Sequence, residues 1–373
     1  MKIAVMGIRG IPANYGGFET FAEELAPRLV ERGHDVTVFG RSNIIDYKEP
    51  YYKGVRIKIL PTISHKYLDT VVHTWVSTMA SFFTPFDVVF ICNSANALFC
   101  LFPRLWGKPT ILNVDGLEWQ RQKWNTFGKL FYKISEWLAT VIPSAIVTDA
   151  REVERYYQKR FNKESIFIPY GAPENKVTTQ EILDQYQLQP QEYILYVSRM
   201  EPENNAHRVV KAFERVKTDK KLVMVGDAPY SSDYIAELKK TQDQRIIFTG
   251  YVFGRGYKEL QSHAYFYVQA TEVGGTHPAL LEGMGYGNCV LANDVPEHRE
   301  VLGPAGIYFD RFDDRDLAEK MQYLCDQPET MKNYRVNVKQ RVKDRYSWDK
   351  VTEQYERLFR RAAKSRLKKF ERN

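Results

Sequence analysis

Four glycines, Gly7, Gly10, Gly16 and Gly17, follow the apolar opening of the chain in MKIAVMGIRGIPANYGGFET. A glycine-rich loop between a strand and a helix lets backbone N–H groups approach an anion, and a helix N-terminus favours negative charge. We therefore expect Gly16 and Gly17 to approach a phosphate, and Glu19 to contact a sugar or an acceptor. The alternative is a loop kept for packing alone.

This loop does not have the dinucleotide-binding pattern. That pattern requires G-x-G-x-x-G and an acidic residue about 20 residues later for the ribose. The glycines are spaced differently here, and the second apolar run, DVTVFG, ends in Arg41 where an acid is needed. The sequence therefore disfavours a nicotinamide-dependent oxidoreductase, which remains only as an alternative.

A second glycine-rich stretch, ATEVGGTHPALLEGMGYGNCVLAND, follows the apolar run YFYVQA. Proline is favoured in the first turn of a helix, so Pro278 predicts a helix beginning there. The N–H groups of Gly275, Thr276 and His277 would then point at an anion above the strand, and a diphosphate suits such a site. Glu282 lies one turn further on. Its carboxylate either accepts ribose hydroxyls or is simply favourable near the helix N-terminus.

A third polar stretch, NVDGLEWQRQKW, follows the apolar run TILNV. Carboxylates suit sugar hydroxyls, tryptophan offers an apolar stacking face, and arginine binds two phosphate oxygens at once. The candidates are Asp115 and Glu118 for sugar hydroxyls, Trp119 and Trp124 for stacking, and Arg121 and Lys123 for phosphate. For Trp124, an ordinary core position is an equally good interpretation.

Short apolar runs alternate with amphipathic stretches along most of the chain. The runs are KIAVMG, DVTVFG, VRIKIL, DVVFIC, TILNVDG, AIVTDA and SIFIPYG, then YILYVSR, KLVMVGD, RIIFTGYV, YFYVQA, NCVLAND and GIYFD. Such alternation is typical of parallel sheets covered by helices on both faces. The polar stretch 171–191, with two prolines, predicts an inter-domain linker.

These elements predict an α/β protein with two doubly wound, Rossmann-like domains. We expect an N-terminal domain over 1–172, a second, ligand-binding domain over 173–346, and a terminal helix with a basic tail over 347–373. Ligands of open α/β sheets bind at the carboxyl ends of the strands, so we expect the site in a cleft between the two domains.

The composition is that of a soluble globular protein, with 44% hydrophobic and 27% charged residues. No apolar run approaches the ~18 residues of a membrane span. The four cysteines are scattered without metal-binding spacing, which favours a reducing cytoplasm. Much of the net charge of +7 lies in RLFRRAAKSRLKKFERN at the end of the chain. This tail either binds an anionic membrane surface, on its cytoplasmic face, or is a solvated helix end; nucleic acid is not expected.

The quoted stretches resemble the large retaining glycosyltransferase family 4. In that family's carboxylate signature, E-x(7)-E is followed by A-M-A-x-G-x-P-V, and LLEGMGYGNCVLAND is similar to it. GIRGIPANYGGFET, VDGLEWQRQKW and VGGTHPALLEGMG resemble a subgroup rich in bacterial rhamnosyltransferases. The resemblance implies the GT-B fold, with a C-terminal helix crossing back to the first domain. It also implies transfer of a sugar from a nucleotide diphosphate, dTDP-L-rhamnose being the best match, to a lipid-linked glycan in cell-surface polysaccharide synthesis. A UDP- or GDP-sugar is the alternative donor.

The chain departs from the family pattern at two places. The first glutamate of the signature falls at Gly274 and is absent, with Glu272 two residues away. Arg199 fills the family's arginine position, whereas Asn204 and Asn205 stand where its lysine belongs. These departures keep open a catalytically degenerate sugar-binding protein.

Other residues are candidates to compensate. Arg255, or Arg9 and Arg121, would replace the missing positive charge, and Asp115 takes the place of the donor-facing histidine of many relatives. Backbone groups around Gly250 are expected to contact the base of the donor.

The resemblance implies a mechanism without an enzymic nucleophile, in which the leaving diphosphate takes the acceptor's proton on the same face. The protein then positions the sugars and stabilises the growing charge, and we assign these catalytic roles to Asp115, Glu118 and Arg199. No metal and no other cofactor is expected. The D-x-D at Asp314–Asp316 predicts the start of a helix.

Overall fold

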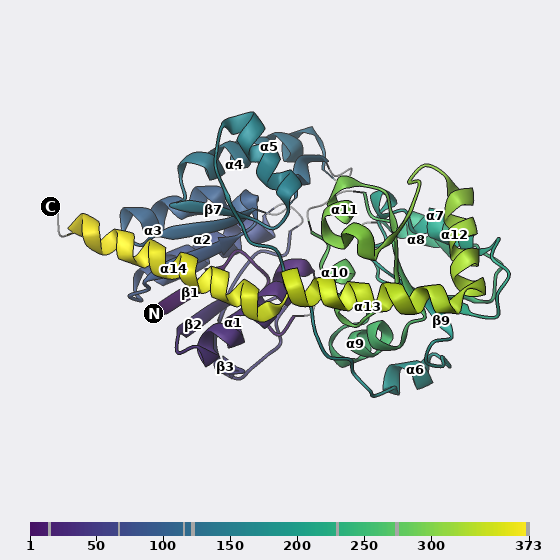
Figure 1. The fold of residues 1–373 in the computed structure, drawn as a ribbon. Helices are drawn as coiled ribbons and strands as arrows, with labels where there is room; N and C mark the ends of the chain where they lie inside the picture. Colours follow the sequence, from purple (N-terminus) through teal and green to yellow (C-terminus); the bar gives the residue numbers. More distant parts are fainter. Residues whose placement is uncertain are drawn as a thin grey trace. The chain divides into compact units, whose positions relative to one another are not determined.

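The computed structural model describes residues 1–13, 16–65, 68–114, 116–120, 124–228, 231–272 and 276–370, the last five of these by backbone alone. The chain divides into two compact units (Figure 1). The first comprises Met1–Tyr170 with Trp348–Asn373, and the second Gly171–Ser347.

An eight-stranded sheet forms the centre of the first unit, in the order β3-β4-β2-β1-β5-β6-β7-β8. Its strands are β1 Lys2–Met6, β2 Asp35–Arg41, β3 Tyr51–Tyr52, β4 Val55–Leu60, β5 Val88–Cys92, β6 Thr110–Val114, β7 Ala145–Thr148 and β8 Ile166–Phe167. Their neighbours pair in parallel, except that β3 runs antiparallel to β4. The short strand β3 was not predicted from the sequence, because two residues are too few to form a hydrophobic pattern.

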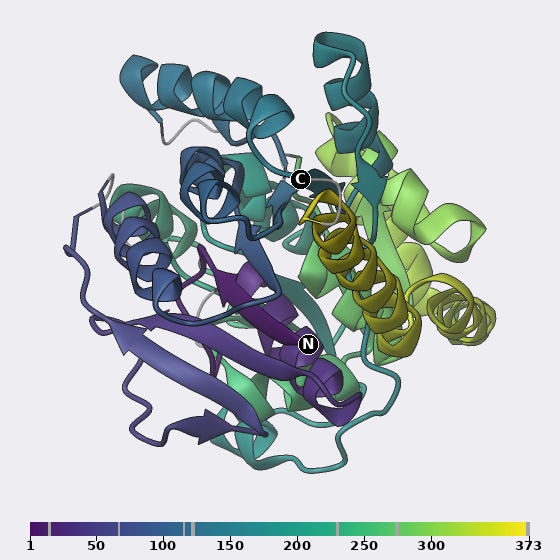
Figure 2. The same cartoon turned by 90° about the vertical axis from the view of Figure 1, so that its left-hand side faces the viewer.

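Helices pack on both faces of this sheet, as Figure 2 shows from the side. They are α1 Gly17–Glu31, α2 Asp69–Phe82, α3 Leu101–Leu105, α4 Thr126–Val141, α5 Arg151–Phe161 and α14 Trp348–Phe370, with the 3-10 helices η1 Ser94–Cys100 and η2 Glu118–Gln120. The side chains of β5 alternate between the two faces of the sheet. Val89 and Ile91 belong to a hydrophobic cluster that includes residues of α4 and α5. Phe90, between them, instead contacts the rings of Phe21 and Tyr355.

The terminal helix α14 completes the first unit. Tyr355 and Phe359 are fully buried, and their rings lie 5.4 and 5.5 Å from that of Phe90. The Tyr355 hydroxyl accepts a hydrogen bond of 3.2 Å from the Asn113 amide at the end of β6. The helix that the GT-B resemblance implied therefore packs on the first domain.

The second unit has a six-stranded parallel sheet in the order β11-β10-β9-β12-β13-β14. Its strands are β9 Tyr193–Val197, β10 Lys221–Val225, β11 Ile246–Gly250, β12 Phe266–Gln269, β13 Val290–Asn293 and β14 Ile307–Phe309. Its helices are α6 Glu181–Gln185, α7 Ala206–Phe213, α8 Ser232–Leu238, α9 Gly254–His263, α10 Pro278–Gly285, α11 Pro296–Leu302, α12 Asp314–Asp326 and α13 Pro328–Arg345, with the 3-10 helices η3 Pro202–Asn204 and η4 Gly303–Ala305. Each apolar run of the sequence is thus a strand.

The stretch 171–191, expected as a linker, is largely a packed part of the second unit. Leu183 of α6 is fully buried. The Glu259 carboxylate in α9 accepts the Ile182 N–H at 2.9 Å and the Thr179 hydroxyl at 2.5 Å. The polar composition of this stretch did not predict the short helix α6. Contacts with α9 stabilise this helix, and not an apolar pattern in its own sequence.

Among the described residues, no helix combines the length and the apolar character needed to cross a membrane.

Candidate functional site

Strand order fixes where each sheet can bind a ligand. In the first sheet the chain moves outward from β1 to β2 and β4, then returns to β5 on the other side of β1. In the second it moves from β9 to β10 and β11, then returns to β12. The loops on either side of such a reversal diverge and leave a crevice at the carboxyl ends of the strands. The glycine loop follows β1, and the second glycine-rich stretch follows β12, so both lie at these points.

The glycine loop is held tightly under its helix. Gly7 has φ +84°, and a Cβ atom there would lie 2.4 Å from the Cys92 carbonyl oxygen. Helix α1 begins at Gly17, preceded by Gly16 with φ 79°. Gly16, the residue at the cap of the helix, has no side chain to occupy this end. The loop therefore presents a helix N-terminus at the carboxyl edge of the sheet, as expected from the sequence.

Glu19 has a structural part in this loop. Its side chain is buried, and its Oε1 accepts the Arg9 backbone N–H at 2.8 Å. Burial raises its pKa, while the charges of Arg9 and Arg41 oppose that rise. Arg41 is itself buried and pairs with Asp69 at 2.8 Å. Arg41, at the end of β2, is thus held by an ion pair with Asp69. It stands where a dinucleotide-binding protein has the acidic residue that binds ribose.

The loop after β6 brings aromatic and acidic side chains together. The Trp124 indole N–H donates to Glu118 Oε2 at 3.2 Å, and the Trp124 ring lies 5.2 Å from Tyr132. Lys133 places its Nζ 4.8 Å from the centre of the Trp119 ring. Trp124 is half-buried and is therefore not an ordinary core tryptophan. Asp115, Arg121 and Lys123 lie outside the described residues.

In the second unit, the two departures from the family pattern meet. Asn205 Nδ2 donates to the Ala270 carbonyl at 3.0 Å and to Glu272 Oε1 at 2.8 Å. Asn204 Nδ2 donates to the Arg199 carbonyl at 2.7 Å. Both asparagines are buried. Asn205 joins the loop after β9 to the loop after β12, and Asn204 bonds within the loop after β9, whereas the missing lysine would have supplied a charge. Arg199 itself is half-buried, 3.7 Å from Glu201.

Helix α10 begins as predicted, with Pro278 in its first turn and His277 at its cap. His277 Nδ1 lies 3.1 Å from Nε2 of the buried His298, whose pKa burial lowers to about 4. Thr276 is buried beside this pair, and Gly275 lies outside the described residues.

One turn into α10, Glu282 accepts a hydrogen bond of 2.5 Å from the Tyr257 hydroxyl. Tyr257 comes from α9, and burial raises its pKa well above the usual value. Its hydroxyl also accepts the Gln261 amide at 3.0 Å. A neutral phenol therefore orients the Glu282 carboxylate. Sequence analysis missed Tyr257 and His298, since neither belongs to a recognisable motif.

Gly250 ends β11 with φ 69°, and no atom lies within 4 Å of a Cβ built on it. Beyond it, the rings of Tyr251 and Phe253 are stacked 5.4 Å apart and partly exposed. Arg255, which follows, donates to the Thr179 hydroxyl at 3.0 Å and lies 3.5 Å from Glu259. It belongs to the contacts between α6 and α9.

The D-x-D residues have structural partners. Asp314 pairs with Arg208 at 2.9 Å, Asp316 accepts the Asp310 N–H at 2.7 Å, and the preceding Asp313 caps α12. Helix α12 begins at Asp314, as predicted. Within the described part of the chain, no group of three or more histidine, cysteine or acidic side chains is arranged to hold a metal ion.

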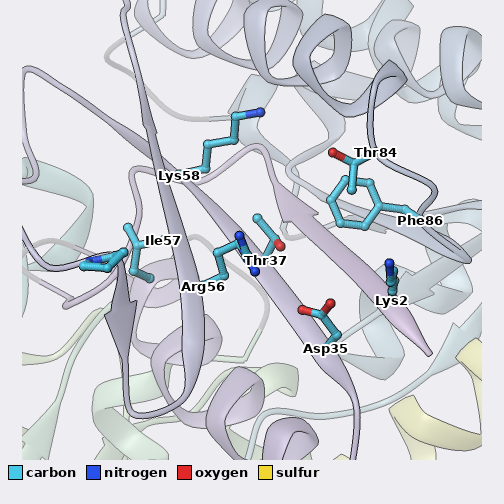
Figure 3. A pocket seen from close by; sticks show the side chains of 9 residues that line it. Lys2, Asp35, Thr37, Arg56, Ile57, Lys58, Thr84 and Phe86 are labelled. Carbon is cyan, nitrogen blue, oxygen red and sulfur yellow. The ribbon is translucent and has the colours of Figure 1, made fainter.

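A hollow on the first unit lies at the opposite edge of its sheet (Figure 3). Its lining includes Lys2 at the start of β1, Asp35 at the start of β2, Arg56 near the start of β4, and Phe86 just before β5. These are the amino ends of the strands. The hollow is therefore separate from the candidate residues.

Both units of the chain match family models of glycosyltransferases. The family model described as "Glycosyltransferase Family 4" matches residues 15–172, and the model "Glycosyl transferases group 1" matches residues 191–327. The two matches together cover most of the chain and correspond to its two α/β units. The chain therefore has the GT-B fold, and each of its two units matches a glycosyltransferase family model.

Curated relatives match over part of their length. The O-antigen chain mannosyltransferase B of Escherichia coli is 29% identical over 152 residues, covering 39% of this chain and 40% of that protein. An N-acetylgalactosaminyltransferase of Campylobacter jejuni, named for a diacetylbacillosaminyl-diphospho-undecaprenol substrate, is 23% identical over 188 residues. That match covers 49% of this chain and 50% of the relative. The chain thus spans about half the length, or less, of these two proteins.

Solved structures show the same fold over almost the whole chain. Sucrose-phosphate synthase from Thermosynechococcus elongatus superposes with a TM-score of 0.81 at 18% identity, covering 96% of this chain and 98% of that one. Anabaena HepE, solved in complex with UDP and glucose, superposes with a TM-score of 0.77 at 14% identity, covering 96% and 99%.

Proposed function

We propose that this protein is a retaining glycosyltransferase that moves a sugar from a nucleotide diphosphate to a glycan in cell-surface polysaccharide synthesis. The observation that carries the proposal is the position of the candidate residues. In the second unit, Arg199 follows β9, and Thr276 and His277 follow β12, the two strands at which its strand order reverses. The match of both units to glycosyltransferase families supports it.

The donor's diphosphate is assigned to the N-terminus of α10. Backbone N–H groups at Thr276 and His277 and the guanidinium of Arg199 would stabilise its charge, and that charge grows as the sugar leaves. Glu282, oriented by Tyr257, would accept the ribose hydroxyls. The exposed rings of Tyr251 and Phe253, beside Gly250, are suited to the base.

The acceptor side is assigned to the first unit. Glu118 and Trp119 lie at the carboxyl edge of its sheet, with Asp115, Arg121 and Lys123 in the same stretch of sequence. We propose that the leaving diphosphate takes the acceptor's proton, and that these residues position the two sugars. No step requires a nucleophile from the protein.

The finer specificity is also a proposal. Three sequence segments favour dTDP-L-rhamnose as donor, and a UDP- or GDP-sugar is the alternative. A lipid-linked acceptor is supported by the diphospho-undecaprenol substrate in the name of the Campylobacter relative. The proposed location is the cytoplasm or the cytoplasmic face of the membrane.

Thermal shift with dTDP, UDP, GDP and NAD tests the donor class. We expect one nucleoside diphosphate to raise the melting temperature and NAD to have no effect. A panel of labelled nucleotide sugars with a lipid-linked acceptor then identifies the sugar. Stabilisation by NAD alone would overturn the proposal.

A catalytically degenerate sugar-binding protein is the second candidate. The observation that favours it is the replacement of the family's lysine by Asn204 and Asn205, whose amides are bound to the protein itself. Binding of a nucleoside diphosphate without turnover of any sugar in the panel would support this candidate.

A further inference from the structure

The first unit exposes large apolar side chains on one region of its surface. More than half of the exposed large hydrophobic residues described in the structure lie between residues 68 and 141. Monomeric soluble proteins rarely expose contiguous apolar patches of more than a few hundred Å², and larger patches mark sites of interaction.

Helix α4 is the centre of this region. Its outward residues are Phe127, Leu130, Phe131, Ile134, Trp137 and Val141, all exposed, with Phe127 at 82% and Trp137 at 54%. The buried side of the helix is composed of Tyr132, Ser135, Glu136 and Ala139. The amphipathic pattern is therefore reversed, because a surface helix of a soluble protein normally turns its apolar stripe toward the core.

Neighbouring elements extend the apolar surface. Arg104 of α3 donates to the carbonyl of Val141 at 3.1 Å, which holds α3 against the end of α4. Leu98, Leu101 and Leu105, from η1 and α3, are exposed. The ring of Trp106, just after α3, lies 4.8 Å from Phe82 of α2. We call these residues of α2, η1, α3 and α4 the apolar face.

The charge of this region is positive. Among the described residues from 94 to 141, the carboxylates are Glu118 and Glu136, and Glu136 is buried. Lys129 and Lys133 come from the two turns of α4 that carry Phe127, Leu130 and Phe131. An apolar stripe with bulky aromatic residues, flanked by lysines and lacking exposed acids, is typical of helices that lie in the interface of an anionic membrane.

We propose that the apolar face docks on an anionic lipid bilayer, with α4 lying along the interface. Helix α4 begins two residues after Trp124, and Lys133 of α4 contacts Trp119. Docking therefore brings the proposed acceptor residues to the membrane surface. The inference goes beyond the proposed sugar transfer, and it differs from attachment through the basic tail.

Co-sedimentation with vesicles tests this proposal on the full chain. The probes are vesicles of phosphatidylcholine mixed with phosphatidylglycerol, and vesicles of phosphatidylcholine alone. The test variant is Phe127→Glu with Ile134→Glu. Its matched control is Phe312→Glu with Val336→Glu, two similarly exposed positions on the second unit.

We expect the test variant to bind mixed vesicles at least about tenfold more weakly than the wild type. The control should bind like the wild type, and both should give the same thermal shift with nucleoside diphosphate. Lys129→Gln with Lys133→Gln should reduce binding at low salt only. Equal sedimentation of test variant and wild type overturns the proposal, as does a wild type that binds neither vesicle.

Two further measurements separate the competing explanations. A protein lacking residues 364–373 should keep the Phe127- and Ile134-dependent binding at high salt; its complete loss would assign the attachment to the tail and overturn the proposal. Size-exclusion chromatography should show a monomer without lipid. A dimer that Phe127→Glu with Ile134→Glu dissociates would assign the apolar face to a second copy of the chain.

Discussion

At the scale of single residues, Asn205 and Glu272 show how the second unit departs from its family. An amide and a carboxylate joined by a hydrogen bond of 2.8 Å connect two loops without adding positive charge. We therefore propose that Arg199, which is half-buried, neutralises the diphosphate from this part of the unit.

Replacing Arg199 should therefore affect phosphate recognition selectively. We expect Arg199→Ala to weaken nucleoside diphosphate by about 10–100-fold, the loss of a charge-assisted hydrogen bond of ~1.5–3 kcal/mol. Nucleoside monophosphate should be affected far less. Calorimetry with both ligands measures the difference, with Arg215→Ala, an exposed position, as control. Equal weakening of the two ligands would indicate a folding defect.

We expect Glu282 to act by accepting hydrogen bonds from the ribose hydroxyls of the donor. Glu282→Gln should lower kcat/KM for the donor by about 10–100-fold, because a charged acceptor is replaced by a neutral one. Tyr257→Phe should lower kcat/KM less, because it removes the hydrogen bond that orients the Glu282 carboxylate but keeps the carboxylate itself. Steady-state kinetics on folded variants measures both, and the exposed Glu319→Gln is the control. Wild-type kinetics in Glu282→Gln would remove this residue from the site.

At the scale of elements, α4 carries a titratable group on its buried side. Burial raises the pKa of Glu136 to about 7, and the Tyr156 hydroxyl donates to it at 2.8 Å. A carboxyl group with a raised pKa holds its proton longer in the folded than in the unfolded state. Its contribution to stability is therefore present below about pH 4.5 and is lost as the pH rises toward 7.

Glu136→Gln should consequently be more stable than the wild type above pH 7. The advantage should reach up to about 3 kcal/mol, since one pKa unit corresponds to about 1.4 kcal/mol. It should shrink as the pH falls and vanish near pH 4.5. Denaturant unfolding across this range measures it. The control is Glu154→Gln, which removes the ion pair with Arg151 on α5. A difference independent of pH would contradict the assignment.

The sequence predicted elements better than it predicted side-chain roles. Continuous apolar runs identified the parallel strands because a strand buried on both faces has no polar alternation. Pro278 located the start of α10. The apolar stripe of α4 would normally predict the buried face of the helix, whereas Phe127 and Ile134 of that stripe are exposed in the structure. Tyr257 could not be found either, since its contact with Glu282 joins two helices that are separate in the sequence.

At the scale of the whole molecule, the chemistry should be independent of metal ions. In the nearest sequence match to a metal motif, Asp314 pairs with Arg208 and Asp316 accepts the Asp310 N–H. We expect transferase activity to survive dialysis against EDTA. Loss of activity that magnesium or manganese restores would return these carboxylates to consideration.

The path of the chain has a consequence for how the protein is made. The first unit lacks part of its core until α14 arrives, because Tyr355 and Phe359 cover Phe21 and Phe90. During translation, residues 171–347 emerge before α14 does, so the second unit can fold while the first still exposes these rings. The first unit can therefore complete its core only after the second has been translated, and apolar rings exposed in that interval favour aggregation. We expect residues 1–347 alone to bind a hydrophobic dye that the full chain does not bind, and a peptide of residues 348–365 added in trans to reduce that signal.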